Sequence, residues 1–220
     1  MTAVVLPPRE AWSRIAPVYD AAPNPLVALE QRTLAPLLGP LQGKVVADVA
    51  AGTGRWTRYC AARGARALAL DFCDAMLRGA PRPAILADAH LLPLPDACVD
   101  LAICAFGLGY APDCLAELAR ITRPGGAVFV SDVHPEALRR GWTRTFRAGG
   151  EVIEAAHHAC ELEHLTAPGL ELVCRIEPRL GPEERTIFEA AGKLADFETA
   201  SRHAAIFVAQ WRRSPWKPAR

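Results

Sequence analysis

The sequence predicts an α/β fold in which a doubly wound, mostly parallel sheet carries helices on both faces. From Lys44 to Ser131, short apolar segments typical of buried strands alternate with segments typical of helices. Strands and helices that alternate at this spacing form parallel sheets through right-handed crossovers. The chain has 220 residues, 51% of them hydrophobic, which is enough for one domain with a substantial core.

The segment from Val45 to Thr57 combines an apolar strand, a glycine-containing turn and the start of a helix. Gly52 and Gly54 leave no Cβ atom where a ligand would approach the backbone closely. The helix N-terminus that follows offers unpaired N–H groups to such a ligand. Asp48 is a carboxylate in an otherwise apolar strand, so we expect it to bind the N–H groups of the turn or a polar ligand.

The other elements follow from apolar periodicity, helix caps and the positions of glycine and proline. We expect strands over 44–49, 65–70, 84–87, 99–104, 127–131, 170–176 and 203–211, and a hairpin within 141–154 that turns at Gly149-Gly150. We expect helices over 7–19, 25–36, 55–63, 74–77, 113–121, 160–165 and 182–191, the second of them capped by Asn24. Arg123 to Gly126 is predicted to be a tight turn, and the sheet is predicted to end with one antiparallel strand.

Polar or glycine-rich sequence follows five of the predicted strands. These strand ends are Asp48 with its glycines, Asp71, Asp88, Ala105 with Phe106, and Asp132 with His134. Parallel sheets bind ligands at the carboxyl ends of their strands, at the point where the strand order reverses. The five strand ends together therefore predict a ligand site at this edge of the sheet.

Composition argues against several classes of protein. The net charge of +1 gives no general attraction to nucleic acids or anionic membranes, so no nucleic-acid partner is expected. No apolar stretch approaches the ~18 residues of a membrane span, and the N-terminus does not resemble a signal peptide. The seven cysteines contain no CxxC pair, which predicts reduced thiols in a cytoplasmic protein without a metal site.

Asp48-x-Ala50-x-Gly52-x-Gly54 resembles motif I of the class I S-adenosylmethionine-dependent methyltransferases. The resemblance continues in order through Asp71, Ala87-Asp88-Ala89, Leu94-Pro-Asp96, Asp100 to Cys104 and Leu118 to Gly126, and it covers roughly 44–134. The subgroup that it resembles most is the ubiquinone/menaquinone type, through Arg14-Ile-Ala-Pro-Val-Tyr-Asp20. The resemblance implies a Rossmann-like fold, the cofactor S-adenosylmethionine (SAM) and methyl transfer to a small-molecule acceptor.

The resemblance also implies roles for single residues. Asp71 matches the acidic residue that binds the ribose hydroxyls, and Asp88 matches the one that faces the adenine amino group. The remaining expected cofactor-binding residues are Tyr19 as part of a lid, Asp48, Ala50, Gly52, Gly54, Phe72, Met76, Ala89 and Ala105. Simpler interpretations remain open: helix capping for Asp71, turn capping for Asp88, core packing for Phe72 and Met76, and plain packing for Tyr19.

Ala50 stands where the family usually has its first glycine. A Cβ atom is tolerated at this position if φ is negative. It would also lie near the methionine part of the cofactor, which it could crowd.

Methyl transfer from a sulfonium is an in-line displacement, and a base is needed only if the acceptor arrives protonated. His134, just after the fifth strand of the series, is the best-placed candidate for that base, and a turn histidine is the alternative. One of His157 and His158 could face the acceptor, although surface placement is the simpler interpretation. Tyr110 and Trp142 could stack on an aromatic acceptor or only fill the core.

Three other functions remain as alternatives. The first is an enzyme of the same fold that binds SAM without transferring its methyl group, such as a cyclase. The second is a nicotinamide-dependent oxidoreductase, which the pattern disfavours because Thr57 replaces the third glycine of G-x-G-x-x-G. The third is a nucleic-acid modifier that uses the basic tail Arg212 to Arg220, against which the near-neutral charge argues.

We divide the single predicted domain into a helical lid (1–43), a cofactor-binding core (44–134) and an acceptor-side region (135–220). The sequence leaves the acceptor open, and also whether the chain is a monomer or a homodimer.

Overall fold

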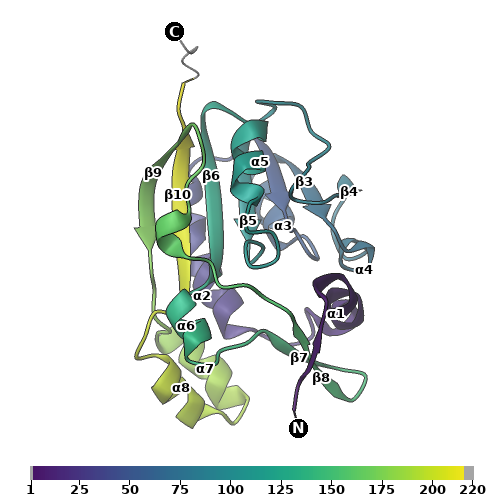
Figure 1. Cartoon of the computed structure of the whole chain (residues 1–220), viewed down its shortest axis with the longest axis vertical. Coiled ribbons are helices and arrows are strands. Elements are labelled where there is room, and N and C mark those ends of the chain that lie inside the picture. Colours follow the sequence, from purple (N-terminus) through teal and green to yellow (C-terminus); the bar gives the residue numbers. More distant parts are fainter. Residues whose placement is uncertain (1, 216–220) are drawn as a thin grey trace.

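The computed structural model describes residues 2–215 and is built around one seven-stranded sheet (Figure 1). In spatial order its strands are β4 (Ala84–Leu86), β3 (Arg66–Asp71), β2 (Val45–Val49), β5 (Val99–Ala105), β6 (Thr122–Val133), β10 (Ile206–Arg213) and β9 (Leu170–Ile176). The strands from β4 to β6 pair in parallel, and β10 is antiparallel to both of its neighbours. The predicted doubly wound sheet with one antiparallel strand is therefore confirmed.

Helices cover both faces of this sheet. They are α1 (Pro8–Ile15), α2 (Pro25–Leu34), α3 (Arg55–Ala61), α4 (Asp74–Leu77), α5 (Cys114–Ile121), α6 (Pro135–Arg139), α7 (Pro182–Ala190) and α8 (Leu194–Ala200). Short 3-10 helices follow at Ala16–Val18, Ala35–Leu38 and Leu162–His164. In Figure 1, α5 lies in front of the sheet and α3 behind it. The predicted cap of α2 is confirmed, because Asn24 Oδ1 accepts hydrogen bonds from the N–H groups of Leu26 and Val27 at 2.9 and 3.3 Å.

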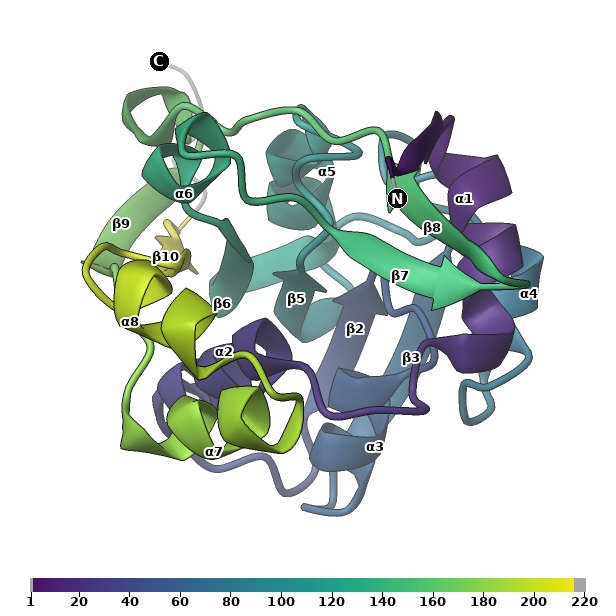
Figure 2. The ribbon, with the colours of Figure 1, turned by 90° about the horizontal axis from the view of Figure 1, so that it is seen from below.

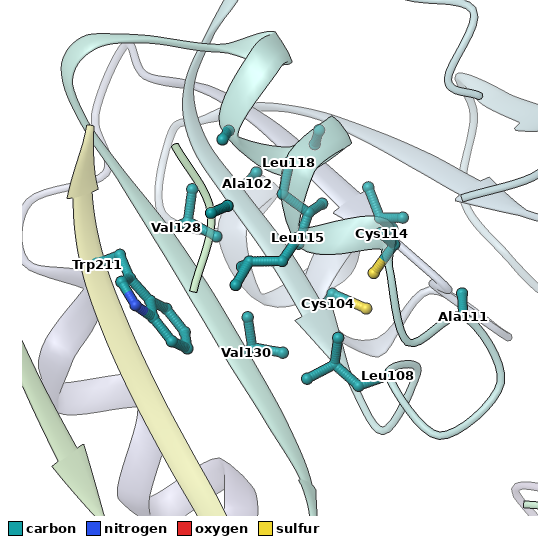
Figure 3. Packing of buried hydrophobic residues seen from close by; sticks show 14 of the residues in the cluster. Ala102, Cys104, Leu108, Ala111, Cys114, Leu115, Leu118, Val128, Val130 and Trp211 are labelled. Carbon is teal, nitrogen blue, oxygen red and sulfur yellow. The ribbon is translucent and has the colours of Figure 1, made fainter. Parts of the chain in front are cut away.

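The core lies between the sheet and these helices. Figure 3 shows the face under α5, where Leu115 and Leu118 pack against Val128 and Val130 of β6 and near Trp211 of β10. A second cluster fills the opposite face, with α2, α3 and the sheet all contributing buried side chains. Because β2 and β5 are buried on both faces, their sequences are mostly apolar, as is the part of β6 from Ala127 to Val130.

A second, three-stranded sheet has the order β1 (Val4–Leu6), β8 (Glu151–Ala155) and β7 (Thr145–Ala148). The hairpin predicted within 141–154 is confirmed, and both turn glycines, Gly149 and Gly150, have positive φ. Figure 2 shows β7, β8 and α1 lying across one end of the large sheet, where β2, β3 and β5 finish. The small sheet and α1 therefore cover the carboxyl ends of the parallel strands.

The structure differs from the sequence prediction in a few elements. The predicted turn at Arg123 to Gly126 lies inside β6 as an irregularity, because the pairing register jumps from Val99–Thr122 to Leu101–Ala127. The first predicted helix stops as an α-helix at Ile15 and continues only as a 3-10 turn that contains Pro17, which lacks a backbone N–H.

Other differences concern short segments. The candidate helix at 160–165 is only the turn Leu162–His164. The final strand begins at Ile206 rather than at His203. The sequence prediction missed β1, α6 and α8, which have three, five and seven residues and little amphipathic signal.

The basic tail extends partly beyond the structure. Arg212 and Arg213 belong to β10, whereas 216–220 lie outside the described residues. Within 2–215, none of the helices combines the length and the hydropathy that crossing a membrane requires.

Candidate active site

A cavity lies at the carboxyl ends of β2, β3 and β5 and is bounded on the other side by α1 and the small sheet. Its volume is about 1070 Å³, counting the open mouth. Every predicted cofactor-binding residue except Gly54 lines it: Tyr19, Asp48, Ala50, Gly52, Asp71, Phe72, Met76, Asp88, Ala89 and Ala105. Four of the five predicted strand ends therefore come together in space, whereas the fifth, Asp132 with His134, does not line the cavity.

Gly54 is not among the lining residues. It precedes α3 with φ of +82°, and a Cβ atom there would lie 2.6 Å from Pro81 Cδ and 3.1 Å from Ala80 Cβ. The close approach of the segment after α4 therefore accounts for this glycine.

Asp48 is buried and uses its carboxylate to hold the start of α3. Its Oδ2 accepts hydrogen bonds from both the backbone N–H and the hydroxyl of Thr57, each at 2.7 Å. Burial raises the pKa of Asp48 to about 6, although the bonds from Thr57 act in the opposite direction. The sequence predicts that Asp48 binds the N–H groups of the turn or a polar ligand; the backbone N–H that it binds is instead that of Thr57 in α3, and its side chain also borders the cavity.

Asp71 connects the end of β3 to two neighbouring loops. Its Oδ2 accepts the N–H of Gly52, and its Oδ1 accepts the N–H of Cys73, both at 2.8 Å. Burial raises the pKa of Asp71, and the backbone hydrogen bonds oppose that shift. Each carboxylate oxygen has two acceptor positions, so each retains one for a ligand hydroxyl after these bonds.

Asp88 lies on a more exposed part of the cavity wall. Its Oδ1 accepts the backbone N–H of His90 at 2.9 Å and lies 2.8 Å from His90 Nδ1. These two hydrogen bonds lower the pKa of Asp88. Asp88 therefore provides a polar group at the rim beside Ala89, and its bonds to His90 hold it in place.

Two loops at the cavity contain residues with strained backbones. Ala50 has φ of +55° and Phe106 has φ of +56°, and both line the cavity. Non-glycine residues with positive φ are uncommon and cluster at functional sites. From the sequence, a Cβ atom at Ala50 is expected to be tolerated if φ is negative, and the φ of Ala50 is positive. Ala50 therefore carries a backbone strain that a glycine at this position would avoid.

Aromatic side chains form the end of the cavity near α1. The rings of Tyr19, Tyr110 and Phe146 surround Trp12, with centroids 5.8, 5.6 and 5.7 Å from its ring. The guanidinium of Arg144 lies among them, 4.9 Å from the centroid of the Trp12 ring. The expected position of Tyr19 at the cavity is therefore observed.

His134 does not line the cavity. It precedes α6, where its Nδ1 accepts the N–H of Glu136 at 3.1 Å and its Nε2 lies 3.1 Å from Glu177 Oε2. The role of catalytic base thus gains no support from the geometry of the cavity.

His157 and Trp142 also lie away from the cavity lining. His157 points inward, but to Asp132, whose Oδ1 is 3.0 Å from its Nε2. Trp142 packs against the core cluster on the other face of the sheet. Of the aromatic candidates for acceptor contacts, only Tyr110 lines the cavity.

Sequence reasoning missed Arg9, Trp12 and Arg144 as lining residues. A signal for Arg144 exists in its position two residues before Phe146, since Phe146 and Ala148 are the partly buried and buried positions of β7. A charged residue next to the partly buried face of a hairpin indicates that its side chain binds a polar or charged partner.

Comparisons with known proteins agree with this geometry. A family model described as "Methyltransferase domain" matches residues 47–130. Residues 47–130 thus resemble a methyltransferase domain. Residues 47–130 supply most of the residues that line the cavity, namely those between Asp48 and Ala111. The other lining residues, Arg9, Trp12, Tyr19 and Arg144, lie outside the domain match.

The chain has curated relatives. A malonyl-[acyl-carrier protein] O-methyltransferase from Serratia marcescens is 36% identical over 140 residues, which are 59% of this chain and 53% of that protein. A demethylmenaquinone methyltransferase from Renibacterium salmoninarum is 35% identical over 135 residues, covering 55% of this chain and 56% of that protein. The chain thus spans about half the length of the curated relatives that it matches.

Solved structures share the fold. A SAM-dependent methyltransferase from Mesorhizobium loti superimposes with a TM-score of 0.65 over 84% of this chain and 97% of that one, at 23% identity. At this identity, the likeness supports the Rossmann-like fold of the methyltransferase domain.

Proposed function

We propose that this chain transfers a methyl group from SAM to a small-molecule acceptor. The observation that carries the proposal is the convergence of Asp71, Asp88 and the Gly52 loop on one cavity at the carboxyl ends of the parallel strands. The methyltransferase domain match over 47–130 supports it independently.

The cavity fits the adenosyl part of SAM. Asp71 retains acceptor capacity on both oxygens after its bonds to Gly52 and Cys73, and a ribose diol offers two adjacent O–H donors. We assign Asp71 to the ribose, and Asp88 with Ala89 to the adenine. Gly52, Ala50 and Ala105 border the space for the methionine part, and Phe72 and Met76 contribute apolar walls.

Thr57, at the position of the third glycine in a dinucleotide-binding loop, favours SAM over a nicotinamide cofactor. Thr57 stands at that position, and both its N–H and its hydroxyl are bound to Asp48. A dinucleotide site uses a glycine there for close helix–strand packing. In this chain, the side chain of Thr57 and the Asp48 carboxylate fill the corresponding space.

The chain's own residues have two tasks in this proposal. When bound, SAM supplies an electrophilic methyl group on a sulfonium. Orientation of the acceptor against that methyl group is assigned to the walls near α1, where Trp12, Tyr19 and Tyr110 pack edge to face. Correct orientation alone can supply ~7–11 kcal/mol of the rate acceleration.

Exclusion of water is the second task. The N-terminal segment 1–43 is proposed to act as a lid, since Arg9, Trp12 and Tyr19 close one side of the cavity. Segment 135–220 is proposed as the acceptor side, through Arg144 and the hairpin that bears it.

Calorimetric titration of the purified chain with S-adenosylhomocysteine (SAH), SAM and NADH tests the proposal. We expect micromolar binding of SAH and SAM and none of NADH. Asp71→Asn and Asp71→Ala should weaken SAH binding by about 10–100-fold, because a hydrogen bond to a charged group contributes about 1.5–3 kcal/mol. Binding of NADH, or of none of the three, would contradict the proposal.

Asp74→Ala is the matched control. Asp74 lies three residues after Asp71, but it is exposed and forms an ion pair with Arg78 on the surface. Its loss should leave SAH affinity unchanged, so a loss confined to the Asp71 variants reports on the cavity.

A further inference from the structure

Arg144 places a guanidinium inside the aromatic end of the cavity. Its Cζ lies 4.9 Å from the ring centroids of both Trp12 and Phe106, and 5.8 Å from that of Tyr110. An arginine that stacks on aromatic rings keeps its planar N–H donors directed along the ring edges. The packing thus fixes the orientation of this cation at the cavity wall.

No carboxylate in 2–215 forms an ion pair with Arg144. Its Nη1 donates a hydrogen bond to the carbonyl oxygen of Phe106, at 3.0 Å. The acidic side chains of the same cavity have other partners: Asp48 binds Thr57, Asp71 binds backbone N–H groups, and Asp88 binds His90. The guanidinium therefore retains several N–H donors for an anion.

Tyr110 provides a second polar group at the same place. Its hydroxyl oxygen is buried and has no hydrogen-bond partner among the described residues, and its side chain lines the cavity. Burial raises the pKa of Tyr110 to about 12, so the hydroxyl keeps its proton at neutral pH and can donate it in a hydrogen bond. A buried hydroxyl without a partner is costly, which indicates a role in binding a ligand.

We infer that Arg144 and Tyr110 together bind the carboxylate of the acceptor, so that the acceptor of this chain is a carboxylic acid with an apolar or aromatic body. The inference rests on the proposed methyltransferase function. A carboxylate has two oxygens that accept hydrogen bonds from an arginine fork and from a hydroxyl at the same time. The rings of Trp12, Phe106 and Tyr19 provide the apolar surface for the rest of the molecule.

The place of Arg144 in the chain favours the acceptor over the cofactor as the source of this carboxylate. Arg144 and Trp12 lie outside the domain match of 47–130. Trp12 belongs to α1 and Arg144 directly precedes β7, and both residues line the cavity. The residues assigned to the adenosyl group lie instead at the ends of β3 and β4. SAM has a carboxylate of its own, so the experiment separates the two sources.

The test is calorimetric titration of the SAH-saturated chain with two acids, phenylacetate and hexanoate, and with their amides. The acid and the amide of a pair share their shape, so a difference between them reports the recognition of charge. We expect each acid that binds to bind at least 10-fold more tightly than its amide. Arg144→Gln should remove this preference, because a charge-assisted pair is worth about 10–100-fold in affinity.

Arg147→Gln is the matched control. Arg147 is exposed on β7, the strand that begins directly after Arg144, and alternation along β7 directs Arg147 away from the face that bears Phe146. This variant should keep the preference for acids. Tyr110→Phe should reduce the preference without abolishing it, since only one donor is lost.

The outcomes distinguish the inference from the function on which it rests. Failure of the unaltered chain to bind SAH would overturn the proposed function. Normal SAH binding without a preference for either acid would overturn the inference alone. Weaker SAH binding in Arg144→Gln would also overturn it, because Arg144 would then bind the carboxylate of the cofactor. If Arg144→Gln does not fold, Arg144→Lys, which keeps the charge but loses the planar fork, replaces it and should lower the preference for acids.

Discussion

The N–H of Gly52 donates a 2.8 Å hydrogen bond to Asp71 Oδ2, and this bond joins the loop after β2 to the end of β3. Gly52 reaches this position with φ of +57°. A Cβ atom on it would lie 3.1 Å from Met76 Cε, which also lines the cavity. The shape of the cavity beside Met76 thus depends on the absence of a side chain at Gly52.

Replacement of Gly52 by alanine should therefore affect both stability and binding. The positive φ costs about 1–2 kcal/mol for a residue with a Cβ atom, and Met76 must move in addition. We expect a lower midpoint in urea unfolding and weaker SAH binding in titration. Gly149→Ala is the control, because Gly149 has a similar φ of +58° and nothing within 4 Å of its Cβ position. It should lose comparable stability with unchanged SAH affinity; equal loss of affinity in both variants would contradict the role of Gly52.

Gly107 packs so closely against Ala50 that it has no room for a Cβ atom. A Cβ atom on Gly107 would lie 2.6 Å from Ala50 Cβ and 2.6 Å from Cys104 Sγ. We expect Gly107→Ala to destabilise the chain by about 1–3 kcal/mol through overpacking. Ala50→Gly should be tolerated on its own, because it relieves the strain of φ at +55°.

The double variant tests whether Ala50 and Gly107 are coupled, by urea unfolding of all four proteins. Ala50→Gly removes one of the two clashes, so Gly107→Ala should cost less in that background than in the unaltered chain. The clash with Cys104 remains, so part of the cost should persist. Costs that simply add would show that the two residues do not interact.

The sequence predicted the β-strand ends of the site because their positions follow from local patterns. Asp71 and Asp88 each come directly after a short apolar run, and a parallel sheet brings such ends together. The same reasoning does not extend to Arg144 and Trp12, which are far apart in sequence and meet only through the small sheet and α1. No spacing rule connects them.

The backbone at Ala50 and the surroundings of His134 could not be predicted for a different reason. A positive φ at an alanine is imposed by tertiary packing, against local preference. His134 follows a strand as expected, but the helix α6 begins at the next residue, so its ring turns back to the N–H of Glu136. A helix of five residues leaves little pattern in the sequence.

The buried carboxylate of Asp48 should make stability depend on pH. Its pKa is raised from 3.8 to about 6 by burial, so between these values the folded chain binds a proton that the unfolded chain does not. This contribution to stability is fully present below pH ~4 and is lost as pH rises through ~6, by up to about 3 kcal/mol. Asp48→Asn lacks the titration. In urea unfolding from pH 4 to pH 7, the stability of the unaltered chain should fall relative to Asp48→Asn; a constant or rising difference would contradict the buried, protonatable state.

Asp132 and His157 form a buried pair beside the aromatic end of the cavity. Asp132 Oδ1 lies 3.0 Å from His157 Nε2, and Asp132 Oδ2 accepts the N–H of Gly109 at 2.8 Å. A side chain on Gly109 would collide with the His157 ring, so the two segments are in close contact. The ring of His157 also packs edge to face on Tyr110, at 5.0 Å between centroids. The pair therefore supports the wall that contains Tyr110.

The two members of this pair should differ in what their removal costs. Asp132→Ala leaves His157 and the N–H of Gly109 without an acceptor, and we expect a loss of about 3–5 kcal/mol in the free energy of unfolding. His157→Ala should cost less, because Asp132 keeps its hydrogen bonds from Gly109 and Val133. Asp113→Ala is the control, since Asp113 is exposed and its side chain makes no capping hydrogen bond. Equal losses for Asp132→Ala and Asp113→Ala in urea unfolding would show that the buried pair does not stabilise this wall.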